Sequence, residues 1–325
     1  MILPLYLPAD ANSRSSNIMK YDAEADWTLL TTCNFRCAYC FVSEGAQRAK
    51  IKAYGTPLQW KEGFDATGKT WLIHITGGEP TIYPDFADLC EQLSQSHYLS
   101  FNSNLSHLSV EEFAQRIDPR RVHFINAALH DEERQKKESR SVFIDRVHAL
   151  LKRNFNVLVS QVMTPRMVSI FSEAAKDFES HGLHIIPKLI RGDFEGKIYP
   201  DAYSARQKQQ IREYMVEARR QYSAVIERMS EQATIDLFTA ERFINGIPSY
   251  RGKLCGSGYN FVRIDPDGSV IRCGSRKRLG NLLRKKVNLW NAPKPCNTSY
   301  CPYFCEKYTS SQLLPGSTQL TEDLP

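Results

Sequence analysis

The sequence predicts an α/β fold: a partial, TIM-like (β/α)6 barrel followed by a small C-terminal domain that contains a β-hairpin. Two observations lead to this prediction. Over the first 200 residues, short apolar runs of strand length alternate with stretches of helical period, which is the pattern of successive βα units. Residues 251–325 instead carry short strand-like runs, turn residues and five of the nine cysteines.

The apolar runs that predict strands of the barrel lie at 26–32, 71–76, 98–103, 122–127, 156–162 and 183–189. Helices are predicted between them at 84–96, 109–117, 140–154 and 166–181. Because parallel strands need such crossovers, which are nearly always right-handed, these units build a parallel sheet. We divide the chain into an N-terminal extension (1–25), the barrel core (26–200), a helical linker (201–250) and the C-terminal domain (251–325).

Length and composition limit the class of protein. The 325 residues, 42% of them hydrophobic, are enough for one large core and a smaller appendix. The net charge of +6 is compatible with an anionic substrate, but no basic run with interleaved aromatic residues indicates nucleic acid. No stretch reaches the roughly 18 apolar residues of a membrane span. Nine cysteines without a signal peptide indicate the reducing cytoplasm, where cysteines more often bind metals than form disulfides.

A C-x3-C-x2-C triplet, Cys33, Cys37 and Cys40, directly follows the first predicted strand. Three thiolates on one loop can hold three irons of a [4Fe–4S] cluster and leave the fourth iron open for chemistry. A zinc knuckle is the alternative, but no further Cys or His follows within thirty residues; the nearest His is His74. Asn34 between the cysteines argues against a buried apolar strand.

A second motif, Gly77, Gly78, Glu79 and Pro80, follows the second predicted strand. Glycines at a strand end allow the backbone to approach a ligand closely, and a carboxylate there can accept from an ammonium group. In a parallel barrel the active site lies at the carboxyl ends of the strands, where both motifs fall. An ordinary turn is the alternative for this motif taken alone.

The two motifs together resemble the radical S-adenosylmethionine (SAM) superfamily, and Tyr39 before the third cysteine fits that family's C-x3-C-x-aromatic-C form. The resemblance implies that SAM chelates the open iron and is cleaved reductively to a 5′-deoxyadenosyl radical. It also implies that Gly77–Pro80 bind the methionyl amine of SAM. A ferredoxin- or flavodoxin-type protein is then expected to donate the electron.

Other polar residues at strand ends are candidates for SAM or substrate binding. Asn102 and Asn104 follow the third strand and are expected at the ribose, and Gln161 in the fifth strand is expected near SAM, with a satisfied core amide as the alternative. Arg191 or Lys188 is expected to anchor an anionic group. His130 precedes three acidic residues, so an active-site and a solvated loop histidine both remain open.

The C-terminal domain carries the remaining cysteines. Pro266-Asp267-Gly268 between two strand-like runs, 260–264 and 269–273, predicts a β-hairpin that brings Cys255 and Cys273 together. This part resembles the SPASM/Twitch extension of radical SAM enzymes, which implies an auxiliary [4Fe–4S] cluster. The expected ligands are Cys255, Cys273, Cys301 and Cys305, with Cys296 competing for the fourth position. A zinc site of four thiolates is the alternative. Cys90, in a predicted helix, is expected to be core packing.

The substrate is less constrained than the chemistry. The residues before the first strand are too few for a peptide-binding domain, which favours a small metabolite such as a sugar or nucleotide derivative. Maturation of a ribosomally made peptide, by dehydrogenation, cross-linking or epimerisation, is the second hypothesis. A non-catalytic iron–sulfur electron carrier or zinc scaffold is the third.

Overall fold

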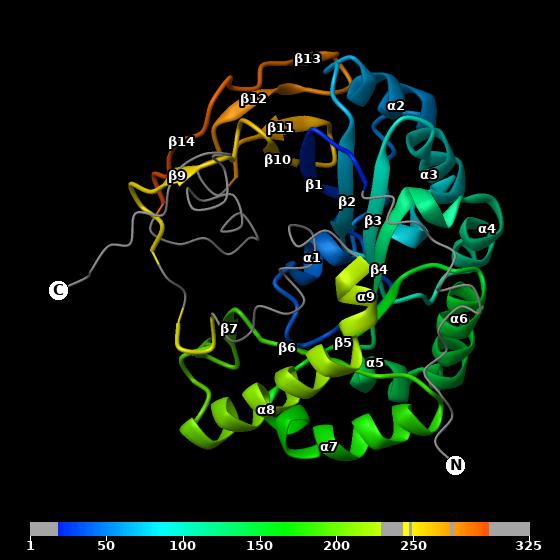
Figure 1. Ribbon diagram of the computed structural model, residues 1–325, viewed down its shortest axis with the longest axis vertical. Coiled ribbons are helices and arrows are strands. Elements are labelled where there is room, and N and C mark those ends of the chain that lie inside the picture. Colours follow the sequence, from blue (N-terminus) through cyan, green and yellow to red (C-terminus); the bar gives the residue numbers. More distant parts are fainter. Residues whose placement is uncertain (1–18, 229–242, 247–248, 274–275, 299–325) are drawn as a thin grey trace.

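A single curved sheet of ten strands organises the protein, in the order β13-β12-β11-β10-β1-β2-β3-β4-β5-β6. The computed structural model describes residues 19–228, 243–246, 249–273 and 276–298. The two edge strands, β13 and β6, do not pair with each other, so the sheet forms a barrel that is open on one side (Figure 1). The predicted α/β class and partial barrel are confirmed.

The six predicted barrel strands are all present and mutually parallel. They are β1 (Ala23–Leu30), β2 (Trp71–Gly77), β3 (Tyr98–Ser103), β4 (Val122–Ala128), β5 (Val157–Val162) and β6 (Ile186–Lys188). The first strand begins three residues earlier than predicted, because Glu24 points its carboxylate at His74 and does not interrupt the strand.

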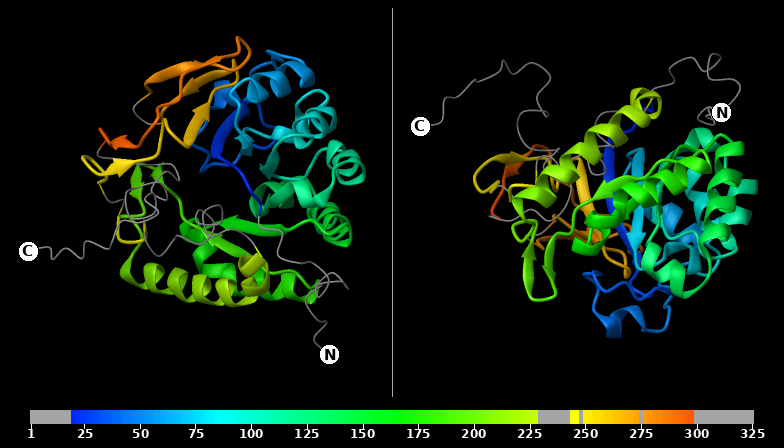
Figure 2. Two further views of the ribbon diagram at one scale, coloured as in Figure 1. Left: turned by 45° about the horizontal axis from the view of Figure 1, so that its top comes forward. Right: turned by 90° about the horizontal axis from the view of Figure 1, so that it is seen from below.

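The predicted helices lie on the outer side of the sheet (Figure 2). They are α3 (Phe86–Ser94), α4 (Ser109–Arg116), α6 (Arg140–Lys152) and α7 (Pro165–Ser180). In the described part of the predicted helical linker (201–250) lie two helices, α8 (Ala205–Gln221) and α9 (Ser223–Arg228). Shorter helices are α1 (Glu44–Gln47), α5 (Asp131–Lys136), η1 (Pro80–Ile82) and η2 (Pro119–Arg121).

The helix α2 (Pro57–Asp65), which lies between β1 and β2 in the chain, was not predicted. Its signals are a capping box, in which Thr56 and Gln59 satisfy each other's backbone donors, and a proline at the first helical position. Its buried residues include Trp60 and Phe64, which pack on Trp27 of β1.

The C-terminal hairpin is confirmed and extends the barrel sheet. Strands β10 (Phe261–Ile264) and β11 (Ser269–Ile271) are antiparallel, and Gly268 in their turn has a φ of +80°. Strand β10 pairs with β1 in parallel, Glu24 opposite Phe261. Beyond the hairpin lie β12 (Arg278–Asn281) and β13 (Lys286–Val287). Two small two-stranded sheets join β9 (Leu254–Cys255) to β14 (Lys294–Pro295) and β7 (Gly192–Phe194) to β8 (Lys197–Tyr199).

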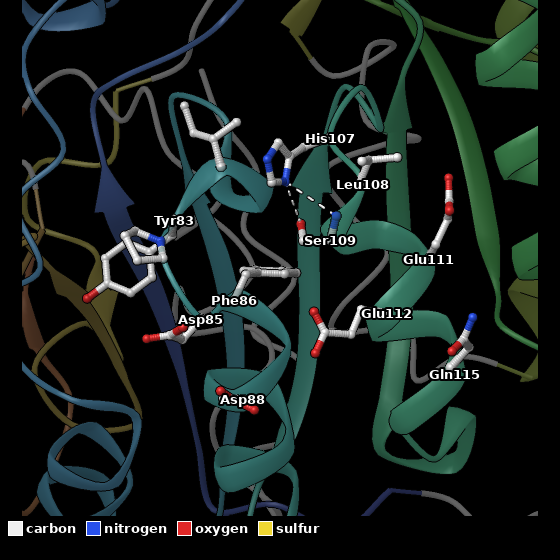
Figure 3. Close-up of a pocket in the computed structure, with 12 residues that line it drawn as sticks. Tyr83, Asp85, Phe86, Asp88, His107, Leu108, Ser109, Glu111, Glu112 and Gln115 are labelled. Atoms are coloured by element: carbon white, nitrogen blue, oxygen red, sulfur yellow. Dashed lines mark hydrogen bonds between the residues drawn. The ribbon is translucent and has the colours of Figure 1, made fainter.

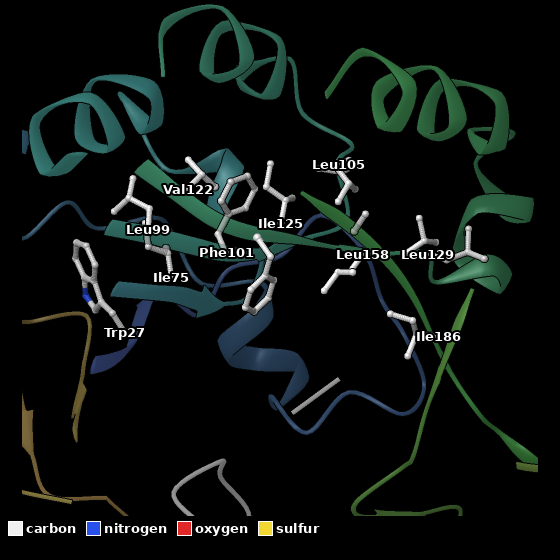
Figure 4. Close-up of a cluster of buried hydrophobic side chains, with 14 of the residues drawn as sticks. Trp27, Ile75, Leu99, Phe101, Leu105, Val122, Ile125, Leu129, Leu158 and Ile186 are labelled. Carbon is white, nitrogen blue, oxygen red and sulfur yellow. The ribbon is translucent and has the colours of Figure 1, made fainter. Parts of the chain in front are cut away.

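The main hydrophobic core lies between the sheet and its outer helices. Trp27, Ile75, Phe101 and Ile125 point from the strands to that side (Figure 4). Cys90 of α3 is fully buried there, as predicted. Burial raises the pKa of its thiol far above the usual range, which suits inert packing. Among the described helices, none is long and apolar enough to cross a membrane.

Candidate active site

The cysteine loop begins where β1 ends, and short hydrogen bonds fold it onto α1. The Thr32 hydroxyl donates to the Ala49 carbonyl (2.8 Å), and the Cys33 amide donates to the Gln47 carbonyl (3.1 Å). Figure 2 shows this segment and α1 extending past one end of the sheet. Cys33 and Cys37 are half-buried and Cys40 is exposed. The loop therefore has a defined shape that presents all three thiols.

The three thiols interact with one another. Burial raises the pKa of Cys33 to about 11 and that of Cys37 to about 12, and the neighbouring thiols add to each shift. Burial also raises the pKa of Cys40. Such thiols ionise at neutral pH when a metal displaces their protons. Three thiols on one loop fit a cubane cluster, in which Cys33, Cys37 and Cys40 would hold three of the irons. Among the described residues, no group of Cys, His, Asp or Glu is arranged to hold a single metal ion.

Gly77 and Gly78 allow the end of β2 to lie against the cysteine loop. The Gly78 amide donates to the Leu30 carbonyl (2.8 Å), and the Glu79 amide donates to the Thr32 carbonyl (2.9 Å). A Cβ added at Gly77 would lie 2.0 Å from the Leu30 oxygen, and one at Gly78 would lie 2.0 Å from the Thr32 oxygen. The two glycines thus allow a close approach to the backbone at the end of β1 and the start of the cysteine loop. Their predicted approach to a ligand stays a prediction.

The carboxylate of Glu79 lies inside the protein and is only 1% exposed. One oxygen accepts from the Thr81 amide (3.0 Å), the Thr81 hydroxyl (2.5 Å) and the Ser103 hydroxyl (2.7 Å), and the other accepts from the Asn104 amide (2.6 Å). Burial raises the pKa of Glu79, and these donors oppose the shift. The carboxylate therefore ties the loop after β2 to the loop after β3. Pro80 begins η1 in the same turn.

The two candidate asparagines occupy different positions. The Asn104 side chain donates to the Asn34 side-chain oxygen (2.9 Å) and accepts from the Ser106 amide (2.9 Å), so it links the β3 loop to the cysteine loop. Asn102 is half-buried on the inner face of the sheet, and its amide lies 3.5 Å from the Thr76 hydroxyl. Asn102 is thus the member of the pair that faces the barrel interior.

Tyr39 contacts His130. The Tyr39 hydroxyl lies 2.8 Å from His130 Nδ1, and the two rings are stacked with centroids 6.0 Å apart. Burial lowers the pKa of His130 to about 3, with contributions from the nearby Arg134 and Lys188. His130 is therefore a neutral histidine that contacts the cysteine loop, and the solvated-loop alternative is not what the structure shows.

Gln161 and Arg191 are the remaining residues that were predicted to bind SAM or an anionic group. The Gln161 side chain accepts from the Asp131 amide (3.1 Å) and donates to the Val162 carbonyl (2.9 Å), so both ends of its amide have protein partners. The Arg191 guanidinium carbon lies 4.4 Å from the centre of the Phe243 ring. Lys188 ends β6 near His130.

The auxiliary cysteines are partly described. Cys255, Cys273 and Cys296 are buried. Burial raises the pKa of Cys255 to about 12, and the thiols of Cys273 and Cys296 add to this shift, so both lie near Cys255. Strand β14 places Lys294 opposite Cys255, which brings Cys296 to the same place. Cys301 and Cys305 lie outside the described residues.

Several polar residues on the inner face of the sheet, besides Asn102, were not predicted. Asp26, Thr28, His74 and Thr76 are half-buried there and alternate with fully buried apolar residues that face the core. His74 Nε2 lies 2.8 Å from a Glu24 oxygen, and the Arg263 guanidinium lies 3.4 Å from Asp26. The alternation of polar and apolar residues over 24–29 is the signal that could have revealed this face.

A separate cavity of about 550 Å³ lies on the outside, between the starts of α3 and α4 (Figure 3). Its rim is acidic: Asp85, Asp88, Glu111 and Glu112 line it, and His107 bonds to Ser109 at one end. None of the residues predicted to bind SAM or iron lines this cavity.

Comparison with known proteins gives a family match for part of the chain. Residues 27–179 match the family model of the radical SAM superfamily. GTP 3′,8-cyclase, mitochondrial, of Arabidopsis thaliana is 34% identical over 70 residues, 21% of this chain and 18% of that protein. Mycofactocin maturase MftC of Mycolicibacterium smegmatis is 24% identical over 259 residues, 76% of this chain and 63% of that protein. The chain thus matches less than two thirds of the length of each relative.

Solved structures share the fold. The structure of anSMEcpe with bound AdoMet (SAM) has a TM-score of 0.53 and 15% identity, covering 80% of this chain and 78% of that chain. Streptococcus suis SuiB bound to S-adenosylmethionine also has a TM-score of 0.53 and 15% identity, covering 83% and 65%. Residues 27–179 therefore match a radical SAM domain, and the solved structures share the fold of the chain.

Proposed function

We propose that Cys33, Cys37 and Cys40 hold a [4Fe–4S] cluster at which SAM is bound and reductively cleaved. When bound, this group supplies a 5′-deoxyadenosyl radical that abstracts hydrogen from an unactivated C–H bond of the substrate. The observation that supports the proposal most directly is the packing of the three-thiol loop against Gly77 and Gly78 at the carboxyl ends of β1 and β2.

The chain's own residues would position SAM and exclude water. Of the predicted SAM-binding residues, Tyr39 and Asn102 are the best placed, because Tyr39 lies on the cysteine loop and Asn102 lies on the inner face. Glu79, Asn104 and Gln161 already have protein partners, so we propose that they chiefly hold the loops in place. The backbone of Gly77–Pro80 and the Arg191 side chain remain proposed contacts.

We propose that the region after residue 250 forms a SPASM/Twitch-like auxiliary cluster domain. Cys255 and Cys273 would be ligands, together with two of the thiols Cys296, Cys301 and Cys305. The nearness of Cys296 to Cys255 favours Cys296 over Cys301 as the ligand beside Cys305. The cluster would accept an electron from the product radical or bind the substrate. A ferredoxin- or flavodoxin-type protein in the cytoplasm would supply electrons to the first cluster.

The inner face supports a small polar substrate such as a sugar or nucleotide derivative. A parallel barrel is usually filled by branched apolar side chains. Here, half-buried hydroxyl, imidazole, amide and carboxylate groups of Asp26, Thr28, His74, Thr76 and Asn102 face the interior. Such groups form hydrogen bonds with hydroxyls and amides. An apolar substrate would displace water from them without replacing its hydrogen bonds.

Maturation of a peptide is the second candidate. Its support is the similarity to mycofactocin maturase MftC, which extends over 76% of this chain. The nucleotide dehydratase of a Thermoplasmatales archaeon is 28% identical but matches only 33% of this chain. A short precursor-peptide gene beside this gene would favour the peptide, and adjacent glycosyl- or nucleotidyl-transferase genes would favour the metabolite.

Anaerobic reconstitution tests the proposal. The reduced protein should form 5′-deoxyadenosine from SAM and hold about eight irons, four per cubane. Cys40→Ala should abolish formation of 5′-deoxyadenosine, whereas Cys90→Ala, which changes a thiol of the core, should retain it. A protein that holds iron or zinc but never forms 5′-deoxyadenosine would be an electron carrier or scaffold, and the proposal would be wrong.

A further inference from the structure

The segment that contains the cysteine loop and α1 is strongly basic. Residues 33–54 include four basic residues and one acidic residue, so their net charge of +3 is half of the +6 of the whole chain. Lys50 and Lys52 are exposed. Lys50 follows Ala49, whose carbonyl accepts a hydrogen bond from the Thr32 hydroxyl (2.8 Å) at the start of the loop. The two lysines are therefore held beside the loop.

Helix α5 borders the loop elsewhere and adds no positive charge. The Arg36 amide donates a hydrogen bond to the carboxylate of Glu133 in α5 (3.0 Å), and Lys136 forms an ion pair with the same carboxylate (2.6 Å). Residues 131–138 together hold four acidic and three basic residues. The excess of positive charge around the loop therefore lies on the side of α1.

The same segment presents an exposed aromatic ring. Phe41 directly follows Cys40 and, at 89%, is the most exposed of the large hydrophobic residues that the structure describes. Single exposed apolar residues are common, and Val216 of α8, 61% exposed, is another. Phe41 differs in its place, because it adjoins a candidate iron ligand in a segment that extends past one end of the sheet (Figure 2). Aromatic contacts within a charged, polar rim are typical of protein docking sites.

We propose that Phe41, Lys50 and Lys52 form the docking surface for an acidic one-electron donor protein of the flavodoxin or ferredoxin type. The inference rests on the proposed function, because it needs the SAM-binding cluster on the same loop. The donor is oxidised by one electron, which passes to the cluster and then to SAM. One C–S bond of SAM breaks, and methionine and the 5′-deoxyadenosyl radical are formed.

The position of this surface suits such a transfer. In the proposed function SAM and the substrate lie on the inner face of the sheet, so a donor protein has to approach the loop from outside. Cys40 is exposed, and a protein that covers Phe41 comes within one residue of it. This matters because electron transfer slows steeply with distance. Lysines beside the contact attract an acidic protein and raise its rate of association by about 10- to 1,000-fold.

The test measures the binding of an acidic flavodoxin to the reconstituted holoenzyme. Phe41→Ser and the double variant Lys50→Gln/Lys52→Gln should each raise the Kd for flavodoxin about fivefold at low salt. About 0.5 M salt should weaken binding to the wild type, because it screens the lysines. Formation of 5′-deoxyadenosine should slow in both variants when flavodoxin is the donor. With dithionite, a small reductant that needs no docking surface, the rate should be that of the wild type.

Matched controls change residues of the same kind away from the loop. Val216→Ser removes an exposed apolar side chain from α8. Lys152→Gln/Arg153→Gln removes two exposed positive charges at the end of α6, which leads into the start of β5 at the opposite end of the sheet. Both controls should bind flavodoxin as the wild type does. Phe41→Leu keeps an apolar side chain and should retain most of the affinity.

The proposal is overturned if either variant of the docking surface holds its full iron content and binds flavodoxin with the Kd of the wild type. Should Phe41→Ser lose iron, the double lysine variant decides. A wild-type protein that is active with dithionite but binds neither flavodoxin nor an acidic ferredoxin also overturns it. A wild-type protein that holds its irons but forms no 5′-deoxyadenosine with dithionite would instead disprove the proposed function.

Discussion

Replacing Gly78 with alanine should disable the site, because this residue sets the distance between β2 and the cysteine loop. The added Cβ would lie 2.0 Å from the Thr32 oxygen and 2.5 Å from the Thr31 oxygen, whereas ordinary contact begins at 3.4 Å. The difference between 3.4 and 2.0 Å requires a backbone shift of about 1.4 Å. Both atoms belong to backbone, so no side-chain rotation can relieve the contact.

Such a shift has two measurable costs. The hydrogen bonds from Gly78 to Leu30 (2.8 Å) and from Glu79 to Thr32 (2.9 Å) would break, and at about 1 kcal/mol each, plus overpacking of 1–3 kcal/mol, the loss is about 3–5 kcal/mol. Displacement of reacting groups by about 1 Å costs roughly 100-fold in rate. Urea unfolding measures the first cost, and the rate of 5′-deoxyadenosine formation measures the second.

Gly45→Ala is the matched control. Gly45 lies in α1 beside the same loop, and a Cβ there meets nothing within 4 Å. Alanine should stabilise this helix by up to about 1 kcal/mol and leave the rate unchanged. If Gly78→Ala were as stable and as active as Gly45→Ala, the packing of β2 against the cysteine loop would not be what holds the site.

Two further predictions concern buried groups. Glu79→Gln replaces an oxygen that accepts a hydrogen bond from the backbone amide of Thr81 or Asn104. In the absence of SAM it should lower the free energy of unfolding by about 1–3 kcal/mol. An unchanged urea midpoint with a raised KM for SAM would instead mean that Glu79 acts only on the ligand. Burial lowers the pKa of His97 to about 4. Because the unfolded chain protonates near 6.5, stability should be full above that pH and fall by up to about 3 kcal/mol as the pH drops to 4. A His97→Gln variant should not show this loss of stability at low pH. A variant with the same dependence of stability on pH as the wild type would show that His97 does not cause the loss.

The barrel could be predicted because each strand is a short apolar run bounded by helical sequence. The run 98–103 matches β3 in both bounds. The pairing of β10 with β1 could not be predicted in the same way, because it joins residues more than two hundred positions apart and no local pattern specifies such a parallel contact. Helix α2 escaped prediction because Gly63 and Pro57 weaken its helical pattern, although its capping box was readable.

The positions of the candidate residues on the fold were easier to predict from the sequence than their contacts. The spacing of the cysteines places Cys33, Cys37 and Cys40 on one loop, which the structure confirms. The partners of Glu79 and Asn104 could not be predicted, because Ser103, Thr81 and Asn34 approach them only in the folded chain.

The most direct test of the central claim is pulsed EPR on the anaerobically reduced protein mixed with SAM that carries a ¹⁵N-labelled amino group. Coordination of SAM at an open iron of the Cys33, Cys37 and Cys40 cluster predicts a ¹⁵N hyperfine coupling, which Cys37→Ala should abolish and Cys90→Ala should retain. A reduced cluster whose spectrum is the same with and without labelled SAM would contradict the account.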